Sequence, residues 1–233
     1  IILLVVRDPA YYDHIFSNKT SNEFSFRDND IDDFKDLVKY LCEKNYKVIR
    51  MGKIMSKKMN YKHDNFIDYA FSDFKSDFFD IFLFSISKFI ISTGSGLDEL
   101  STLFRKKILH LNYGDVTAFN HPLNSNISFI YPKKFFDMKK NRELSIFDIF
   151  RYNLDKVYNV NYYIDNKIVC KSLSAKQMIS ATKEMEDYID NKYLDSSLEA
   201  NREMNNLLNE KYKFENNFFW SRDYLDQLIN NSD

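Results

Sequence analysis

Hydrophobic residues in the first half of the chain fall into short runs separated by segments with helical spacing. Four runs rich in β-branched and aliphatic residues predict buried strands: Ile1–Val6, Tyr46–Met51, Phe89–Ser92 and Ile108–Leu111. Apolar residues at helical spacing predict helices over Ile31–Leu41, over Phe78–Ile86 and from Leu97 onward. Alternating strands and helices are typical of βαβ units. We therefore expect an α/β fold over residues 1–135, with a Rossmann-like, mostly parallel sheet and helices on both faces.

The rest of the chain, residues 136–233, has a mainly helical pattern. A short helix is predicted at Leu144–Asn153, with Ser145 near its start. Ser174 and Gln177 form a capping box for a helix that reaches about Ile189. Residues 195–211 and 221–230 also look helical. We expect a mainly helical C-terminal extension that packs on the sheet domain.

Two features near the start of the chain shape the expected domain. The segment Arg7–Asn29 is polar and predicts a loop, and Asp30 or Asn29 is the candidate N-cap of the helix that follows. The chain begins inside a predicted strand, without an initiator Met. We therefore expect the protein to continue upstream, with an N-terminal half that packs on this domain.

Composition narrows the class of partner and the compartment. With 233 residues, 44% of them hydrophobic, the chain can form one large domain. The 33 basic and 34 acidic residues nearly cancel, so there is no net field for nucleic acid or an anionic membrane. No apolar stretch is long enough for a transmembrane segment. Two Cys provide no disulfide framework, which favours a reducing, cytoplasmic setting.

The segment Thr93–Gly96 is a candidate phosphate-binding turn. It reads Thr-Gly-Ser-Gly and lies between a predicted buried strand and a helix start. Amides of Gly94, Ser95 and Gly96 at such a place can approach a phosphate, and the Ser95 hydroxyl can add a donor. The alternative is a tight turn that needs Gly for its backbone angles. The turn lacks the dinucleotide, P-loop and hydrolase-elbow patterns, which disfavours NAD binding, ATP hydrolysis and serine hydrolysis.

Arginines follow two of the predicted strands. Arg7 comes directly after the first strand, and Arg50 ends the second. Both are expected at the sheet edge that carries Ser95, where guanidinium groups can bind a diphosphate. Arg27, in the predicted loop, can join them. The alternative for Arg7 is a surface ion pair with Asp8 or Asp13.

Several acidic and histidine side chains are candidate contacts for the nucleoside or the sugar. Asp77 and Asp80 are one helical turn apart, and Asp80 is embedded in an apolar run, so it needs a partner. That partner is either a ligand donor or a group of the protein itself. Asp68 is a weaker candidate, and His121 lies in the loop after the fourth strand. No His, Cys and carboxylate cluster has metal-ligand spacing, so we expect no metal site.

Ordered motifs over most of the chain resemble a family of bacterial glycosyltransferases. They are Arg7-Asp8-Pro9, Ser25–Ile31, Val48–Gly52, Ile67–Ala70, Lys75–Leu83, Ile91–Leu97, Leu173–Tyr188 and Ser221–Leu225. The pattern is more distantly similar to the α-1,6- and O-fucosyltransferase superfamily. Val5 stands where those enzymes have a His. The resemblance implies one half of a GT-B-like architecture, with Arg7 and Ser95 on the donor's β-phosphate and Asp80 near the base.

These observations together lead us to expect the donor-binding part of a glycosyltransferase. Arg7 would be the catalytic residue, and it would stabilise the leaving diphosphate without a metal ion or other cofactor. The donor would be a nucleotide sugar, with GDP among the candidate nucleotides, and the acceptor a glycan or another molecule. One alternative is a nucleotide-sugar or phosphate-binding module without catalysis. Another is a nucleotide-sugar epimerase of similar fold, although the sequence shows no clear carboxylate and His pair.

Overall fold

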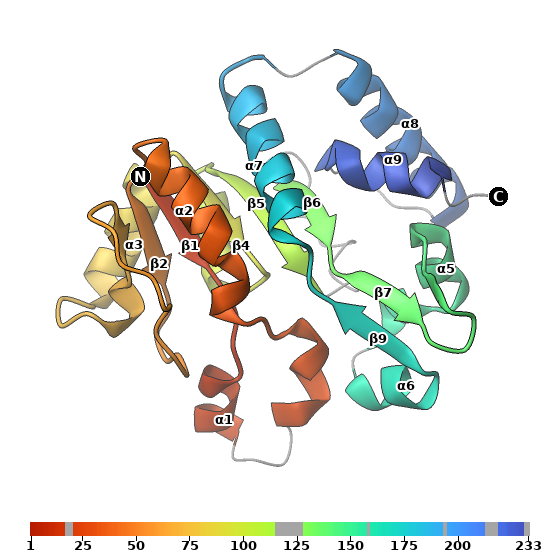
Figure 1. The fold of residues 1–233 in the computed structure, drawn as a ribbon, viewed down its shortest axis with the longest axis horizontal. Coiled ribbons are helices and arrows are strands. Elements are labelled where there is room, and N and C mark those ends of the chain that lie inside the picture. The colour runs from red at the N-terminus through yellow and green to blue at the C-terminus, as the bar shows by residue number, and fades with distance from the viewer. Residues whose placement is uncertain (17–20, 115–127, 158, 193–194, 213–218, 231–233) are drawn as a thin grey trace.

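The computed structural model describes residues 1–16, 21–114, 128–157, 159–192, 195–212 and 219–230. Its centre is a seven-stranded sheet in which every pair of neighbouring strands is parallel. The strands are β1 (Ile2–Val5), β2 (Val48–Met51), β3 (Phe66–Ile67), β4 (Phe89–Ser92), β5 (Lys107–Tyr113), β6 (Ser128–Pro132) and β10 (Phe219–Trp220). Their order is β10-β6-β5-β4-β1-β2-β3 (Figure 1). The expected α/β class and parallel sheet are thus confirmed.

The direction of winding reverses at the middle of the sheet. From β1 the chain moves through β2 to β3 on one side, and then returns to β4, β5 and β6 on the other. The strands β1 and β4 are hydrogen-bonded neighbours, with Leu4 opposite Ile91. In open α/β sheets, such a switch point opens a crevice at the carboxyl ends of the two strands.

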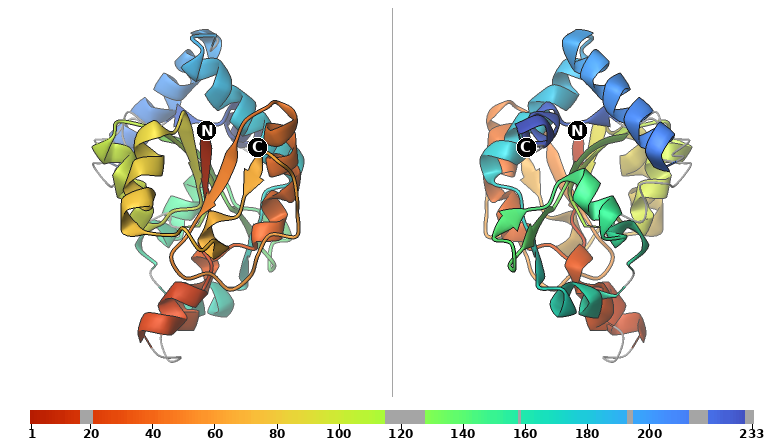
Figure 2. Two further views of the ribbon diagram at one scale, coloured as in Figure 1. Left: turned by 90° about the vertical axis from the view of Figure 1, so that its left-hand side faces the viewer. Right: turned by 90° about the vertical axis from the view of Figure 1, so that its right-hand side faces the viewer.

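Helices cover both faces of the sheet, as expected. Alternate residues of β1 point to opposite faces: Ile2 and Leu4 belong to one apolar core, and Leu3 and Val5 to another. On the first face lie α2 (Lys35–Glu43) and α7 (Ala175–Ile189), and on the second lie α3 (Asp77–Ile86) and α4 (Glu99–Leu103). In the left panel of Figure 2, α2 (orange) and α3 (yellow) lie on opposite sides of the strands.

Helix caps predicted from the sequence are present. The Asp30 carboxylate accepts a hydrogen bond from the Asp32 amide at the start of a 3-10 turn, Ile31–Phe34, that leads into α2. Ser145 and Ser174 open α5 (Ile146–Arg151) and α7 with reciprocal capping boxes. Each cap satisfies amides that the first helical turn leaves without an intrahelical partner.

Residues 136–233 contain strands as well as helices. The strand β7 (Lys134–Asp137) pairs antiparallel with β8 (Arg142–Glu143) and β9 (Ile168–Lys171) in a small second sheet. The helices of this part are α5, α6 (Val160–Asp165), α7, α8 (Asp195–Tyr212) and α9 (Arg222–Asn230). This part therefore contains short strands beside its helices, and the sequence did not indicate them because they are formed by long-range pairing.

The last strand of the main sheet, β10, also comes from the C-terminal part. It pairs with β6, and its Trp220 is fully buried. Asn201 of α8 binds the Trp220 backbone from both sides, by accepting from its N–H and by donating to its carbonyl. The C-terminal part thus completes the sheet as well as covering it.

The segment after β1 differs from the predicted polar loop. It contains α1 (Ala10–Phe16) and a 3-10 helix, Ser21–Arg27. The Asp8 carboxylate accepts from the Ala10 amide at 2.9 Å and so holds the start of α1. The helix lies beyond the carboxyl end of β1, at the bottom of Figure 1. It therefore forms a wall beside the switch point.

Candidate functional site

A cavity of about 400 Å³ lies at the switch point of the sheet. Four groups of residues line it: those at the end of β1 and in α1, Arg27 at the end of the 3-10 helix, those at and after the end of β2, and those of the turn after β4. They are Val5, Val6, Arg7, Asp8, Tyr11, Tyr12, Arg27, Met51, Gly52, Lys53, Ile54, Met55, Ser95, Gly96 and Leu97. Arg7, Ser95 and Gly96, which the sequence predicted as one site, are thus brought together.

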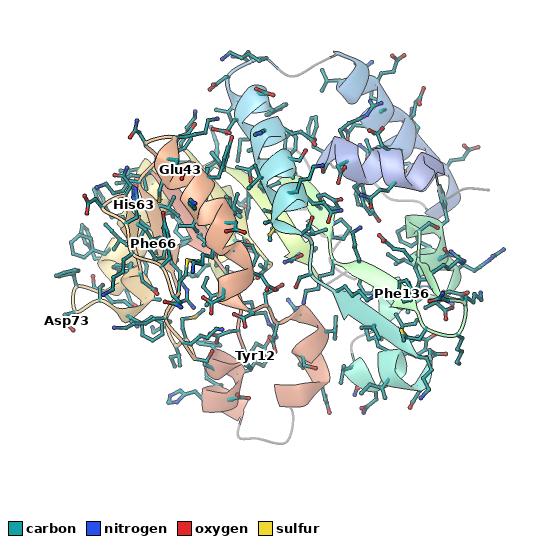
Figure 3. All side chains as sticks on the ribbon, in the orientation of Figure 1. Tyr12, Glu43, His63, Phe66, Asp73 and Phe136 are labelled. Carbon is teal, nitrogen blue, oxygen red and sulfur yellow. The ribbon has the colours of Figure 1, made fainter. Side chains whose placement is uncertain are left out.

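Three contacts hold Arg7 in place just beyond the carboxyl end of β1. Its backbone N–H donates to Thr93 Oγ1 at 2.9 Å, which ties the end of β1 to the turn after β4. Its Nε donates to Asp28 Oδ1 at 3.0 Å, and the guanidinium carbon lies 4.6 Å from the centroid of the Tyr12 ring. Tyr12 is labelled in Figure 3. Among the described residues these contacts use Nε and the face of the guanidinium, so its Nη groups remain available to a ligand.

The alternative considered for Arg7 was a surface ion pair with Asp8 or Asp13, but its ion pair in the structure is with Asp28. Asp28 lies at the end of the 3-10 helix, Ser21–Arg27, which the sequence did not predict. Burial raises the pKa of this carboxyl, although the hydrogen bond from Arg7 acts in the opposite direction. The pair holds Arg7 at the cavity wall.

The turn Thr93–Gly96 combines an internal hydrogen-bond network with one open position. The Gly94 amide donates to Ser92 Oγ, and the Ser95 amide donates to Asp98 Oδ2, both at 3.0 Å. Ser95 Oγ accepts from the Leu97 amide. Two of the three amides expected to face a phosphate are therefore used within the turn, because Asp98 and Ser92 lie directly beneath it.

The two glycines of the turn have different reasons to be glycine. Gly94 has a φ of +93°, and a Cβ there would lie 2.5 Å from the Tyr113 ring. The tight-turn alternative therefore explains Gly94. Gly96 has no such φ, and a Cβ built on it meets nothing within 4 Å. Since Gly96 lines the cavity and begins a 3-10 helix, its amide is placed to approach a bound anion.

The half-buried Asp98 and the buried His110 lie next to the turn. Asp98 accepts from Ser92 Oγ at 2.7 Å, and its Oδ2 lies 3.9 Å from His110 Nδ1. Burial raises the pKa of Asp98 to about 6 and lowers the pKa of His110 to about 3. At pH 7 the carboxyl is therefore ionised and the imidazole neutral. Sequence reasoning did not single out Asp98, although its place three residues after Ser95 is a capping-box signal.

Arg50 lies in the protein interior, in contrast to the expectation that it binds phosphate. Its side chain is fully buried. Its Nη1 donates to the Lys57 carbonyl at 2.7 Å and lies 3.3 Å from Asp68 Oδ2, while Nη2 lies 4.0 Å from Asp8 Oδ2. The reason is its position within β2, one residue before the strand ends. Arg50 therefore orders the loop after β2 and does not line the cavity.

The predicted nucleoside or sugar contacts lie outside the cavity wall. Asp68 binds Arg50 and also accepts from the Met59 amide. Asp77 is exposed at the start of α3 and reaches the rim only through Lys53, at 3.3 Å. Asp80 is half-buried, lies near the Tyr69 hydroxyl and does not line the cavity. His121 lies outside the described residues.

Much of the cavity wall was not found from the sequence. Tyr12 lies in α1, within a segment that we predicted as a loop. Lys53 and Met55 follow Gly52 directly after β2. The rule that ligands bind at carboxyl ends of strands could have indicated this second group, since the end of β2 was predicted. Nothing in the local sequence pattern indicated that α1 and its Tyr12 would line the cavity.

The cavity combines apolar walls with cationic side chains. Val5, Met51, Met55 and Leu97 supply apolar surface, while Arg7, Arg27 and Lys53 supply positive charge. The carboxylate among the lining residues, Asp8, accepts from the Ser56 amide and hydroxyl at 2.8 and 2.9 Å. It also holds the Ala10 amide. The arrangement suits a ligand with an anionic group and an apolar or aromatic part.

Comparisons of the chain with family models, with curated proteins and with solved structures found no match. Within the described ranges, no group of three or more His, Cys, Asp and Glu side chains could hold a metal ion. None of the helices that the structure describes has both the length and the apolar character needed to cross a bilayer. The geometry of the cavity is therefore the basis for assigning a function.

Proposed function

We propose that the cavity binds the diphosphate of a nucleotide sugar and that the chain is the donor-binding part of a glycosyltransferase. The observation that carries this proposal is the convergence of Arg7, Ser95 and Gly96 on one cavity at the switch point. These residues come from the ends of two neighbouring strands. Arg7 and Ser95 match the positions that the glycosyltransferase resemblance assigns to the donor's β-phosphate.

The size and charge of the cavity support this ligand class. Ligand pockets usually have volumes of about 300–1,000 Å³, and this one has about 400 Å³. The Nη groups of Arg7 would make bidentate contact with the diphosphate, and the Gly96 amide would add a donor. The apolar wall around Met51 and Met55 would hold the nucleoside or the sugar.

In the transfer reaction, the bond between the sugar and the diphosphate breaks and negative charge develops on the leaving phosphate. A guanidinium held in place by Asp28 and Tyr12 stabilises this charge without reorganising during the reaction. Removal of one such donor typically lowers turnover by about a hundredfold or more. Arg7 would thus act in both binding and turnover.

A second candidate function is nucleotide-sugar binding without catalysis. Activation of an acceptor hydroxyl usually requires a general base. Among the described residues that line the cavity, the carboxylate Asp8 is already bound by Ser56 and the Ala10 amide. This observation favours a binding module, or a site whose base comes from another segment.

The direct test is ligand binding to the full chain followed by thermal unfolding. We expect GDP, UDP or ADP to raise the melting temperature, and CMP, which lacks a diphosphate, and NAD to have no effect. Ligand at a hundredfold excess over Kd adds about 2.7 kcal/mol of stability. In a protein of this size that corresponds to a rise of about 5 °C or more.

Variants of two arginines make the test specific. Arg7→Ala should remove the shift, while Arg151→Ala, which changes an exposed arginine of α5, should keep it. If the shift persists in Arg7→Ala, or if no nucleotide gives one, the assignment of this cavity is wrong. Release of nucleoside diphosphate from the matching nucleotide sugar then separates the two functions, because a binding module releases none.

A further inference from the structure

The outer face of α3, together with the end of α4, exposes a continuous apolar surface. Each of six side chains on this face is between 42% and 70% exposed. They are Phe78, Phe79, Ile81, Phe82, Ile86 and Leu103, and we call them the α3 patch. The rings of Phe78 and Phe82 are stacked at 6.1 Å, and Phe79 meets both edge-on. The three phenylalanine rings therefore form one contiguous cluster within the patch.

The helix α3 is apolar on nearly all sides. Its inner face, with Leu83 and Phe84, is buried against β1, β2 and β4 in the second core. Its outer face carries the patch. A helix that is apolar all round is normally covered on both sides. A second protein molecule packed on the outer face would cover this side of α3 as well.

The area of the patch matches that of a stable protein interface. An aromatic or large aliphatic residue presents about 200 Å² when fully exposed. At the exposures found here, the six residues together present about 600 Å², at the top of the range for the largest patch on a monomer. A standard interface buries about 800 Å² on each partner. The apolar area of the patch, together with a rim of surrounding polar residues, reaches the area that one partner buries in a standard interface.

The charges at the two ends of the patch are opposite. The helices α3 and α4 lead into and out of β4, so both run from the carboxyl edge of the sheet to the amino edge. At the carboxyl edge, the exposed acidic residues Asp73, Asp77 and Glu99 outnumber Lys75 and Lys53, which pairs with Asp77. Asp73 is labelled in Figure 3. At the amino edge, Arg105 and Lys106 follow the end of α4. The patch is thus acidic at one end and basic at the other.

We propose that the α3 patch is the contact surface for a second copy of this chain, in a two-fold dimer. A two-fold axis that crosses the patch at right angles to α3 places the two α3 helices antiparallel. The acidic end of each copy then meets the basic end of the other, with Phe82 in the middle of each α3 and Phe78 next to its acidic end. The same acidic end disfavours an anionic membrane. This inference does not depend on the proposed function.

The first test measures the mass of the full chain in solution by sedimentation equilibrium. We expect a concentration-dependent dimer at micromolar protein. Phe78→Glu and Phe82→Glu should each weaken dimerisation by about thirtyfold or more, as for central interface residues. Both side chains are exposed in the single chain, so the melting temperature of dilute protein should not fall. Ile164→Glu, which changes a residue of α6 that is 59% exposed, is the matched control and should dimerise normally.

Reversal of charged residues tests whether the two α3 helices pack antiparallel. Asp73→Arg or Arg105→Asp alone should weaken the dimer by about tenfold, and the double variant should recover it. Arg105 has a φ of +53°, a conformation that Asp tolerates well, so the substitution does not threaten the fold. A chain that stays monomeric at all concentrations overturns the proposal. So does a dimer unaffected by Phe78→Glu, and so does a monomer that binds phosphatidylcholine and phosphatidylserine vesicles through the patch.

Discussion

Arg7 and Arg50 show how one position along a strand decides the role of an arginine. Both were expected at the carboxyl edge of the sheet. Arg7 lies two residues beyond the end of β1, where its side chain reaches the cavity. Arg50 is still within β2, so its guanidinium is enclosed by Asp8, Asp68 and the Lys57 carbonyl. A buried arginine needs such partners, because an unpaired buried charge is costly.

The two glycines of the turn make a matched pair for mutation. Gly94→Ala forces a Cβ to within 2.5 Å of the Tyr113 ring at a φ of +93°. We expect a loss of stability of about 1–3 kcal/mol. Gly96→Ala meets open space, so the free energy of unfolding should stay within about 0.5 kcal/mol of the native protein.

Nucleotide affinity should also distinguish the two glycine variants. The Gly96→Ala methyl would project into the cavity, so nucleotide affinity should fall by about tenfold or more while the fold is retained. Urea unfolding and calorimetric titration measure the two quantities. An unchanged affinity in Gly96→Ala would show that the ligand does not approach this turn.

His110 gives a prediction about pH. Among the described residues its two ring nitrogens lack hydrogen-bond partners, and burial lowers its pKa from 6.5 to about 3. The unfolded chain thus takes up a proton near pH 6.5, whereas the native chain does so only near pH 3. Proton uptake therefore favours unfolding as the pH falls through this window. His110→Phe removes the effect and two unpaired polar atoms.

We expect His110→Phe to stabilise the protein by about 1 kcal/mol at pH 7. The gain should grow as the pH is lowered from 7 to 5. Melting temperatures of the two proteins across this range give the comparison. The raised pKa of Asp98 acts in the opposite direction, but it is present in both proteins and largely cancels. A gain that is constant with pH would mean that His110 titrates normally in the folded protein.

At the scale of elements, the sequence predicts the strands, helix caps and turns whose signal lies in a few neighbouring residues. The strands β1 and β4 are continuous apolar runs, and the structure confirms both. The caps of Ser145 and Ser174 depend on residues three apart, so they too can be found from the sequence. The turn after β4 was predicted for the same reason, because its glycines lie between a strand and a helix.

Elements that depend on distant partners could not be predicted in this way. The strand β10 has two residues, and it exists because β6 and Asn201 bind its backbone. The helix α1 lies in a polar segment whose order depends on Asp8 and on the packing of Tyr12 near Phe24 and Arg7. The cavity wall made by α1 was missed with it. What sequence reasoning found was the turn and Arg7, which lie next to predicted strands.

At the scale of the whole molecule, the two expected parts share one core. The larger apolar core joins Leu37 and Leu41 of α2 to Met178 and Met185 of α7. Glu186 of α7 also binds Lys44, at 3.0 Å, and the Tyr40 hydroxyl. Charge and apolar contacts thus link segments more than a hundred residues apart in sequence. Residues 1–135 therefore depend on residues 136–233 for part of their packing.

This dependence leads to a prediction about truncation. Residues 1–135 expressed alone lack β10, so the edge of β6 is open, and they lack α7, so the apolar surface of α2 is exposed. We expect this fragment to aggregate or to show no cooperative urea transition, whereas the full chain unfolds in a single step. Circular dichroism followed during urea titration compares the two. A fragment that unfolds cooperatively as a monomer would show that the sheet domain is independent, and that the C-terminal part only covers it.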